Sequence, residues 1–467
     1  MNLCPPEPPT RNRPIDLPDL LPELVPLLPP YLAQQRWFAG TGRPAVEVRE
    51  ATELVAGPSP VLRLVVETTG ADGLGAALYQ LLLGVRPERP RGLLDLHDLG
   101  EVTTTEGRRA VYDALAHPET ALQVGGTLFP DRRFAAAELQ KGEQSNTSVV
   151  YDDRFILKVF RQLHEGANPD VEVTRALGSV GFADAAVPLD VWADGATDLG
   201  VLRTFERSSG TGASLAAGSI AALLEDGRDP RVAPGDLAAD SRLLGATVAR
   251  LHVALAEAFG TEPADGEAWA RQMSAQLGRV GEGRLDAVRL AVMFDRLAAA
   301  QDLGQAVRIH GDLHLEQVLR LKRRWLVLDF EGEPDRPMAE RRRTSSPLRD
   351  VAGMTRSYQY AAALALRERA TGRKGVSADD RLLATMWVER NMNAFLSGYA
   401  SVDEVHRLLP QSRQSRDALL SVFELDKAVY ELAYELAHRP ELADVPATAV
   451  AQMLDSDPPL PEFPAEP

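Results

Sequence analysis

The chain has 467 residues, a formal net charge of −16 and 45% hydrophobic residues, so we expect a globular protein of two or three packed units. Its acidic balance argues against a nucleic-acid-binding protein, and its single cysteine, Cys4, excludes a disulfide framework and a cysteine-based zinc site. Because no apolar run approaches the ~20 residues of a spanning helix and the N-terminus lacks a signal segment, we expect a cytoplasmic protein that does not enter a membrane.

The first 90 residues predict a small sheet packed on one helix. A helical pattern interrupted by prolines runs from Leu20, and apolar strand patterns follow at residues 46–48, 61–67 and 76–85. Trp37 and Phe38 lie between the helix and the strands, and the simplest interpretation is that they anchor the core.

A second sheet is predicted from Phe134 onward, after a region at 92–127 whose pattern indicates helix and glycine-rich turns. Two strands flank a polar turn, at the point where a glycine-rich loop covers the phosphates in protein kinases. Because this turn has few glycines, phosphate contacts would come from backbone amides and polar side chains, although an ordinary hairpin turn is the alternative. The candidate nucleotide-binding residues here are Gln144, Ser145, Asn146 and Thr147.

Lys158 lies in an alternating strand pattern on the face opposite Leu157 and Val159, where its ammonium could reach nucleotide phosphates. A helix is predicted to begin near Asn168, which is typical of an N-cap. Glu172 on this helix is the expected partner of Lys158, as in kinases, although an ordinary surface ion pair is the alternative. Two more strands follow. By analogy with protein kinases, in which such a strand leads into the hinge, Arg203 on the second is expected to lie along the adenine edge.

From residue 208 the pattern becomes helical. The segment SSGTGASLAAG predicts a flexible connector, and long amphipathic helices follow it. His252 on one of these helices is expected to be a packed core histidine rather than a ligand. In the last long helix, polar and aromatic residues recur every three or four positions, which indicates either a solvated face or the wall of an acceptor site. They are Glu424, Lys427, Tyr430, Glu431 and Tyr434.

The run from Val307 to Pro334 carries the strongest functional pattern. Asp312 lies in a polar loop, Gln317 follows five residues later, and Asp329 comes directly after an apolar strand at 325–328. This spacing suits phosphoryl transfer, in which one acid accepts the proton of the attacking hydroxyl while an amide and a second acid hold Mg²⁺. A lone His-Gly-Asp turn is usually structural, but the full combination is difficult to obtain by chance.

The same run resembles the catalytic and metal-binding loops of the kinase-like phosphotransferases of the aminoglycoside and choline kinase type, with Gln for the usual Asn and DFE for DFG. Within that superfamily, HGDLHLEQVL, VLDFEGEP, SPLRDVAG, QRWFAG, EQSNTS and ELDKAVYE resemble actinobacterial maltokinases. The resemblance implies an α+β, bilobal, eukaryotic-protein-kinase-like fold. Its expected parts are an N-terminal cap subdomain at 1–90, a β-sheet nucleotide-binding subdomain at 91–207 and an all-helical C-terminal lobe at 208–467.

The activity implied is ATP-dependent phosphorylation of maltose to maltose 1-phosphate for α-glucan synthesis, with ATP and Mg²⁺ as cofactors and a monomer or homodimer as the assembly. Asp312 would be the proton acceptor, with His310 and His314 shaping its loop or seating the acceptor, and Asp350 would hold the backbone of that loop. Gln317 and Asp329 would bind the metal. Acceptor contacts would come from Glu331, Tyr358, Glu424, Lys427, Tyr430 and Glu431.

Two alternatives stay open at this point. The acids at Glu331, Glu333, Glu424 and Glu431 would suit a cationic acceptor such as glucosamine, because a buried ammonium requires paired carboxylates. The other alternative is a catalytically inactive binding module with a kinase fold. A module released from catalysis would have no chemical need for both the acid loop and the strand lysine, so a sugar kinase is preferred.

Overall fold

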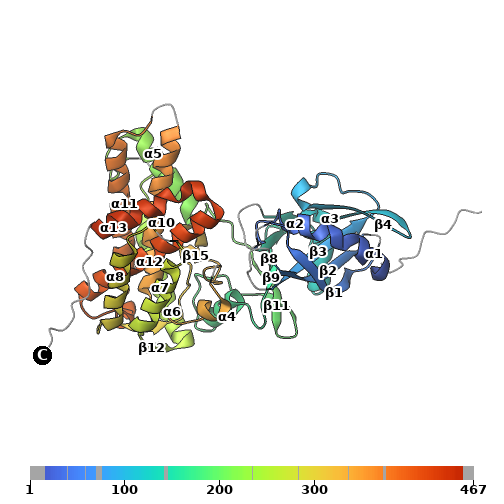
Figure 1. Ribbon diagram of the computed structural model, residues 1–467, viewed down its shortest axis with the longest axis horizontal. Coiled ribbons are helices and arrows are strands. Elements are labelled where there is room, and N and C mark those ends of the chain that lie inside the picture. Colours follow the sequence, from blue (N-terminus) through green and yellow to red (C-terminus); the bar gives the residue numbers. More distant parts are fainter. Residues whose placement is uncertain are drawn as a thin grey trace, which may run out of the picture. The chain divides into compact units, whose positions relative to one another are not determined.

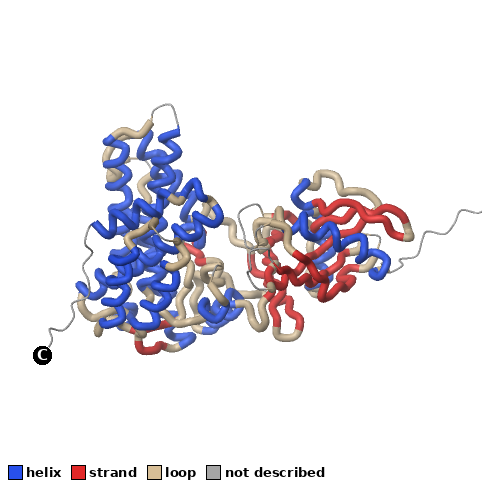
Figure 2. The backbone as a smooth tube through the Cα atoms, viewed as in Figure 1, coloured by secondary structure: helices blue, strands red, loops and turns tan. Residues whose placement is uncertain are grey.

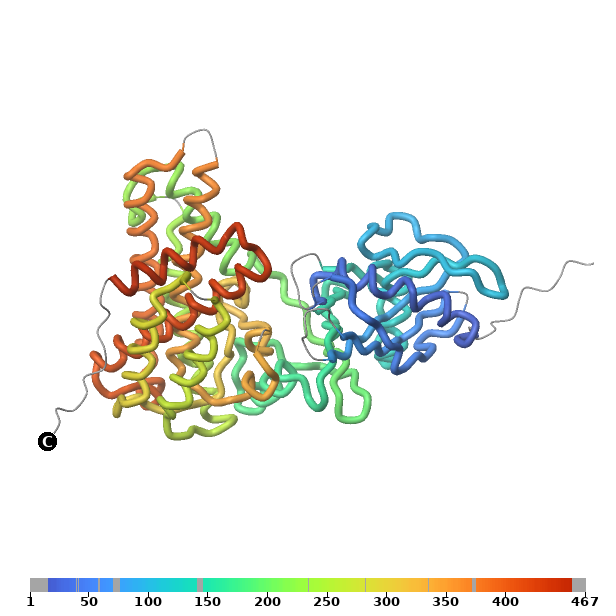
Figure 3. The backbone as a smooth tube through the Cα atoms, viewed as in Figure 1, coloured from blue at the N-terminus to red at the C-terminus, as the bar shows by residue number. Residues whose placement is uncertain are grey.

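The computed structural model describes residues 16–38, 40, 42–57, 59–69, 76–140, 146–233, 235–281, 283–334, 336–371 and 375–455. Its contacts divide the chain into two units. Unit 1 comprises Met1–Val171 and Val187–Arg207, and unit 2 comprises Glu172–Ala186 and Ser208–Pro467. Figure 3 follows the chain through unit 1 in blue to green and through unit 2 mainly in green to red. The three-part division predicted at residues 90 and 207 stays a prediction.

The first sheet of unit 1 is antiparallel, with strand order β1-β2-β3-β5-β4 and the short β9 paired with β3. Residues 62, 64 and 66 of β2 and residues 79, 81 and 83 of β3 share one buried core, as the two-residue period of a strand requires. The helices α1 and α2 pack on this core. The bounds are α1 Leu17–Leu24, α2 Leu28–Leu32, β1 Ala45–Val55, β2 Val61–Thr69, β3 Ala77–Arg86, β4 Asp98–Thr104, β5 Gly107–Asp113 and β9 Gln162–Leu163.

The structure tests the predictions made for Trp37 and Phe38 and for residues 92–127. Trp37 and Phe38 pack against the core, each with its ring near Tyr79, so their predicted role as core anchors is confirmed. The prediction of helix and turns over 92–127 is wrong in its first half, which contains β4 and β5. Their partners are each other and β3, so strand pairing distant in sequence overrides the weak local pattern.

The second sheet of unit 1 has strand order β10-β11-β8-β7-β6, and α3 covers one of its faces. Asp152 and Asp153 both have φ of 54° in the tight turn that joins β7 to β8 as a hairpin. The buried amide of Gln80 on β3 donates to the carbonyls of Phe160 and Leu199 and so ties the two sheets together. The bounds are α3 Pro118–Leu128, β6 Ala137–Leu139, β7 Thr147–Tyr151, β8 Phe155–Val159, β10 Asp190–Asp194 and β11 Thr197–Thr204.

Unit 2 is mainly helical, as Figures 1 and 2 show, with two small antiparallel strand pairs, β12 with β13 and β14 with β15. Two glycines permit the close crossing of α6 and α11. A Cβ at Gly245 would lie 1.9 Å from the Phe395 carbonyl oxygen, and one at Gly398 would lie 1.9 Å from that of Arg242.

The helices of unit 2 are α4 Pro169–Ser179, which crosses the division between the units, α5 Gly212–Asp226, α6 Ala238–Phe259, α7 Gly266–Leu277, α8 Ala287–Ala299, α9 Met338–Arg341, α10 Leu348–Thr371, α11 Ala378–Tyr399, α12 Arg413–His438 and α13 Asp444–Asp455. The strands are β12 Thr261–Pro263, β13 Gln305–Val307, β14 Val318–Arg320 and β15 Trp325–Val327. Over the described part of the chain, no helix has the length and apolar character needed to span a bilayer.

The predicted flexible connector after residue 207 is another error, because α5 begins inside it. The hydroxyl of Thr211 caps this helix by accepting the Ser214 N–H at 3.1 Å. Ala216, Ile220 and Leu223 then enter the large core of unit 2. The alanines and leucines of this segment also favour a helix, so the cap, the helix propensity and the burial all agree. The expected α+β architecture, with a cap sheet, a second sheet and a helical C-terminal region, is confirmed.

Candidate active site

The acid loop of unit 2, residues 308–314, runs from β13 to the short helix η4 (Leu315–Gln317), which leads into the β14–β15 hairpin. Gly311 has φ of +83°, a conformation that suits glycine and lets the loop turn sharply before Asp312. The predicted strand before Asp329 is confirmed as β15, paired antiparallel with β14. The loop and the two strands therefore hold Asp312, Gln317 and Asp329 on one short stretch of backbone.

Asp350 holds the acid loop from the first turn of α10. Its carboxylate accepts the backbone N–H of His310 at 2.8 Å and that of Gly311 at 2.9 Å, which confirms its predicted architectural role. His252 is buried, with Nε2 3.1 Å from Asp350 and Nδ1 2.8 Å from the Tyr399 hydroxyl, so it is a core histidine as predicted. Burial alone would raise the pKa of Asp350, but the hydrogen bonds from His252 and from the Gly311 N–H lower it.

His310 is also buried, and both of its ring nitrogens bond to the backbone. Nε2 lies 2.7 Å from the Leu328 carbonyl oxygen, and Nδ1 lies 3.3 Å from the Asp312 N–H nitrogen. Since a carbonyl only accepts, Nε2 carries the proton and Nδ1 accepts, which is the neutral imidazole. The ring packs on Phe330 at 4.8 Å between centroids. These contacts suit a residue that positions Asp312.

The Asp312 carboxylate lies in a buried ion-pair triad with Lys427 and Glu333. The ammonium of Lys427, on α12, is 3.0 Å from Asp312 Oδ1 and 2.8 Å from Glu333 Oε1. The side chains of Asp312, Lys427 and Glu333 are only 16%, 14% and 6% exposed. His314 Nε2 is 3.8 Å from the other Asp312 oxygen. We call Asp312, Lys427 and Glu333 the acid–lysine triad.

The triad is ionised at neutral pH. Burial alone would raise the pKa of Asp312, but the charges of Lys427 and His314 hold it well below its usual range. Burial alone would likewise lower the pKa of Lys427, yet Asp312 and Glu333 hold it well above its ordinary value. Asp312 is therefore anionic, which is the form able to accept a proton.

Arg336 and Tyr430 extend the triad. Arg336 donates to Glu333 and, at 2.8 Å, to the side-chain oxygen of Gln276. Tyr430 presents its ring 4.6 Å from the Lys427 ammonium, which is within cation–π range. The resulting site combines the ion-paired side chains of the triad and Arg336 with the aromatic ring of Tyr430.

Gln317 and Asp329, the predicted metal ligands, lie side by side. Gln317 Nε2 is 3.4 Å from Asp329 Oδ2. Asp329 has φ of 62°, a left-handed conformation that is uncommon for residues other than glycine and often found at functional sites. An amide and a carboxylate offer the oxygen ligands that Mg²⁺ prefers, so their chemistry fits this ion.

The predicted acceptor residues have different surroundings. Glu424 accepts a hydrogen bond from the Thr355 hydroxyl at 2.6 Å, and Glu431 pairs with Arg356 at 2.6 Å. Burial raises the pKa of Glu424 despite that hydroxyl and the nearby Arg356 charge. Glu331 is half-buried two residues after Asp329.

Tyr358 requires a correction. It is fully buried in the core, where its ring is 6.0 Å from that of Trp387 and 6.4 Å from that of Phe395. The helical period of α10 turns it inward, so it is a packing residue rather than an acceptor contact.

Two of the predicted nucleotide residues of unit 1, Lys158 and Arg203, contact Asp170 on α4. Lys158 Nζ is 3.3 Å from Asp170 Oδ2, and Arg203 Nη1 is 2.9 Å from the same oxygen. The side chain of Asp170 is 1% exposed. Asn168 caps this helix as predicted, with its side-chain oxygen accepting the Asp170 N–H at 2.8 Å.

The predicted pairing of Lys158 with Glu172 is therefore wrong, because the carboxylate that contacts Lys158 is that of Asp170. Within unit 2, Glu172 instead lies 3.5 Å from Arg308 and 3.7 Å from Arg342. Residues two apart on a helix face different directions, so the error is one of helical phase.

Of the polar turn, Asn146 and Thr147 are described, whereas Gln144 and Ser145 lie outside the described residues. Asn146 Oδ1 accepts the Arg161 N–H at 3.3 Å, and Thr147 Oγ1 accepts from Arg161 Nε at 2.7 Å. These two side-chain oxygens therefore fix Arg161, and the hydroxyl of Thr147 keeps its proton available as a donor.

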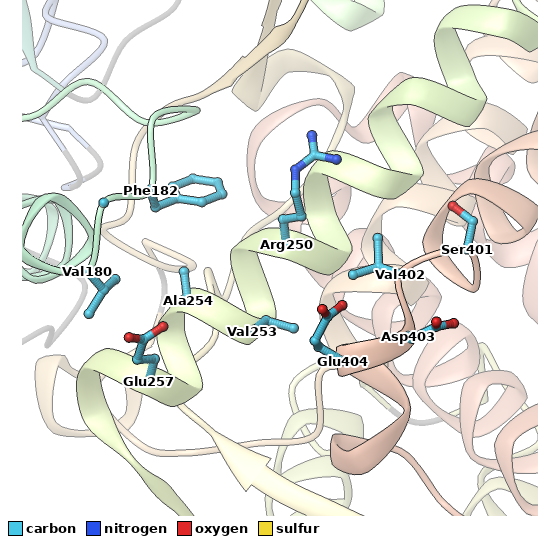
Figure 4. A pocket seen from close by; sticks show the side chains of 11 residues that line it. Val180, Phe182, Arg250, Val253, Ala254, Glu257, Ser401, Val402, Asp403 and Glu404 are labelled. Carbon is cyan, nitrogen blue, oxygen red and sulfur yellow. The ribbon is translucent and has the colours of Figure 1, made fainter.

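A separate pocket of about 530 Å³ lies in unit 2 beside α6 (Figure 4). Its lining includes Phe182, Arg250, Glu257 and Glu404. None of the predicted site residues is among the described residues that line it, so we assign it no part in the acid-loop chemistry.

The sequence did not single out Asp170 or Arg336, and it placed Glu333 only among several acids. Asp170 had a detectable signal, because it is the first acid after the helix start and could have been weighed against Glu172. The contact of Lys427 with Asp312 joins residues 115 positions apart and left no local signal.

Comparison with known families matches residues 31–116 to the maltokinase N-terminal cap domain and residues 136–333 to the phosphotransferase enzyme family. The second match includes Lys158, Asp312, Gln317 and Asp329. Among curated relatives, glucosamine kinase of Mycolicibacterium smegmatis is 28% identical over 327 residues, covering 67% of this chain and 78% of the relative. Glucosamine kinase of Streptacidiphilus jiangxiensis is 28% identical over 345 residues, covering 67% and 72%.

Among solved structures, a glucosamine kinase in crystal form B has a TM-score of 0.62 at 22% identity, covering 93% of this chain and 99% of that chain. A glucosamine kinase in complex with glucosamine, ADP and inorganic phosphate has a TM-score of 0.59 at 21% identity, covering 91% and 99%. These likenesses show a shared fold, and the resemblance inferred from the sequence is confirmed. The chain thus matches a maltokinase N-terminal cap domain followed by a domain of the phosphotransferase enzyme family.

Proposed function

We propose that this protein is an ATP-dependent kinase that phosphorylates the anomeric hydroxyl of maltose, giving maltose 1-phosphate, a donor for α-glucan synthesis. The observation that carries the proposal is the anionic Asp312, held in a loop fixed by Asp350 and paired with Lys427. Transfer of a phosphoryl group to a hydroxyl requires a positioned acid of this kind. The family match supports the reaction class.

Asp312 would accept a hydrogen bond from the sugar hydroxyl and so orient it toward the terminal phosphorus of ATP. As the new bond from oxygen to phosphorus forms, the bond from phosphorus to the bridging oxygen of ADP breaks, and the hydroxyl proton passes to the Asp312 carboxylate. Because the pKa of Asp312 is low, the proton would then be released readily to solvent. His310 would keep Asp312 in place through its ring contacts.

Gln317 and Asp329 are the residues we assign to Mg²⁺, which when bound would neutralise charge on the nucleotide phosphates. In unit 1, we assign Lys158 to the phosphates, with Asp170 rather than Glu172 orienting it. Arg203 shares the same carboxylate and would keep the Asp170 side chain fixed. This grouping is the counterpart of the lysine–acid pair of kinases.

The preference for a neutral sugar rests on how the acids near Asp312 are already paired. The Lys427 ammonium lies between Asp312 and Glu333, and Glu431 pairs with Arg356. An amino sugar would bring a second ammonium to carboxylates that are already neutralised, at a cost in like-charge repulsion. The Lys427 ammonium and the Tyr430 ring are instead suited to the hydroxyls and the apolar face of a neutral sugar.

Glucosamine is the second candidate acceptor. Both curated relatives are glucosamine kinases, and one solved structure of similar fold holds glucosamine. Glu424 is the carboxyl that we would assign to its ammonium, because it bonds to the Thr355 hydroxyl and its pKa is raised. An incoming cation would favour the ionised form of this group.

A coupled assay of ADP release with maltose, glucose and glucosamine at equal concentrations, each with ATP and Mg²⁺, tests the proposal. We expect the highest kcat/KM with maltose. If glucosamine is preferred by about tenfold or more, the choice of acceptor is wrong while the phosphotransferase mechanism stands. If no sugar stimulates ADP release, the kinase proposal itself is overturned.

A further inference from the structure

A second pocket in unit 2, of about 360 Å³, has an arginine-rich lining that the proposed reaction does not use. It lies between α7 and the segment 336–343, and its charged lining consists of Arg271, Arg279, Arg336, Arg343 and Glu340. Four arginines face one glutamate, in a protein whose formal net charge is −16. The local charge is thus opposite in sign to that of the whole chain.

Two of these arginines are available to a ligand. Arg279 and Arg343 are exposed, and within the described residues neither makes an ion pair. Arg271 has only a solvent-exposed pair with Glu267 at 3.3 Å, which contributes little. Arg336 is the inner wall, because its side chain is only 13% exposed and is fixed by Glu333 and Gln276.

We propose that this pocket binds a phosphate-type dianion, either inorganic phosphate or the phosphate group of a sugar phosphate. A guanidinium offers paired N–H donors that match two phosphate oxygens, and several guanidinium groups around one pocket suit a dianion better than a carboxylate. The amide of Gln272 in the lining adds a further donor.

The pocket is connected to the acid–lysine triad by a single side chain. Arg336 lines the pocket and also donates to Glu333, whose carboxylate shares the Lys427 ammonium with Asp312. An anion at Arg336 competes with Glu333 for the same guanidinium, so Glu333 then depends more strongly on Lys427. Occupancy of the pocket therefore changes the surroundings of Asp312 and makes the site regulatory.

The test is isothermal titration calorimetry on the full chain, without nucleotide, using inorganic phosphate in one arm and glucose 6-phosphate in another, with ionic strength kept constant by chloride. The pocket variant is Arg279→Gln/Arg343→Gln. The matched control is Arg381→Gln/Arg407→Gln, which removes two exposed arginine charges of unit 2 that do not line the pocket. Thermal unfolding of each variant checks that the fold is intact.

We expect the pocket variant to bind the anion about tenfold more weakly or worse, while the control binds as the wild type does. The arm that binds more tightly identifies the source of the phosphate group. Absence of binding to the wild type, or equal binding by all three proteins, overturns the proposal, and so does equal weakening in both variants. The readout does not depend on turnover, so the inference can fail or stand independently of the proposed acceptor.

In a second measurement, saturating inorganic phosphate should change the sugar-dependent turnover of the wild type and of the control variant. The pocket variant should have the wild-type turnover without phosphate and should lose the response to it. A response that persists in the pocket variant would show that phosphate acts at the active site, and would overturn the regulatory role.

Discussion

Replacement of Lys427 by methionine tests the acid–lysine triad most severely. The Lys427 ammonium lies 3.0 Å from Asp312 and 2.8 Å from Glu333, so the two carboxylate oxygens are no more than about 6 Å apart. Without the cation, their repulsion at an effective dielectric constant of about 20 is about 3 kcal/mol. That energy corresponds to an increase of about a hundredfold in the affinity of the carboxylate pair for a proton.

We expect Lys427→Met to lower the free energy of unfolding at neutral pH by roughly 3–5 kcal/mol, the usual cost of removing one partner from a buried pair. The sign of the pH dependence follows from the pKa. With its partner gone, burial and repulsion raise the pKa of the carboxylate pair, so stability is lost as pH rises. The deficit relative to wild type should therefore be larger near pH 8 than near pH 5.

Urea unfolding of wild type, Lys427→Met and Lys427→Met/Glu333→Gln at both pH values provides the measurement. The double variant removes the repulsion and should recover about 3 kcal/mol of stability. Lys322→Met is the matched control, because Lys322 is exposed and lies outside the triad, and it should change stability by less than about 0.5 kcal/mol. If Lys427→Met is as stable as this control at both pH values, the account of the triad is wrong.

Three further predictions follow from the same contacts. Asp312→Asn should lower kcat by orders of magnitude while nucleotide binding, measured by calorimetry, survives; unchanged kcat would contradict its role as proton acceptor. Glu424→Gln keeps an acceptor for the Thr355 hydroxyl but cannot ionise. Because the pKa of Glu424 is raised, the wild type loses stability as pH rises, so the gain in thermal stability of the variant over the wild type should be larger near pH 8 than near pH 5. A larger gain at pH 5 would contradict the assignment. Asp350→Asn replaces one of two oxygens that accept backbone N–H groups, so it should cost roughly 2–3 kcal/mol in urea unfolding and lower kcat, whereas wild-type stability would refute its anchoring role.

The long helices and the strands with clear periodicity were predictable from sequence because their burial follows a local pattern. The α12 stripe is an example, since its spacing of three and four residues matched a helix that runs Arg413–His438. The strands β4 and β5 were missed because glycines and charged residues interrupt their alternation, and they are stabilised by the pairing of β5 with β4 and with β3. The helix α5 was missed because Gly210, Gly212 and the neighbouring serines were given more weight than the alanines and leucines that follow, which favour a helix and bury one face in the core.

In the candidate site, too, residues within one local motif were predictable, whereas contacts that depend on tertiary packing were not. The loop from Asp312 to Asp329 was predictable because its residues lie within a single motif, and Asp350 was predictable from its place at the start of the next helix. The predicted partner of Lys158, Glu172, lies two residues from the observed partner, Asp170. Both acids lie on α4, and only the rotation of that helix decides which one faces the lysine. The pairing of Lys427 with Asp312 depends on how α12 packs, which no local pattern specifies.

The most direct test of the central claim is to follow phosphate transfer itself by ³¹P NMR, with ATP, Mg²⁺ and maltose. The wild-type protein should convert ATP to ADP with the appearance of one new signal of a sugar phosphate ester, and Asp312→Asn should give almost none over the same time. Conversion of ATP without a sugar phosphate signal for maltose, glucose or glucosamine, or equal product from the Asp312→Asn variant, would contradict the account.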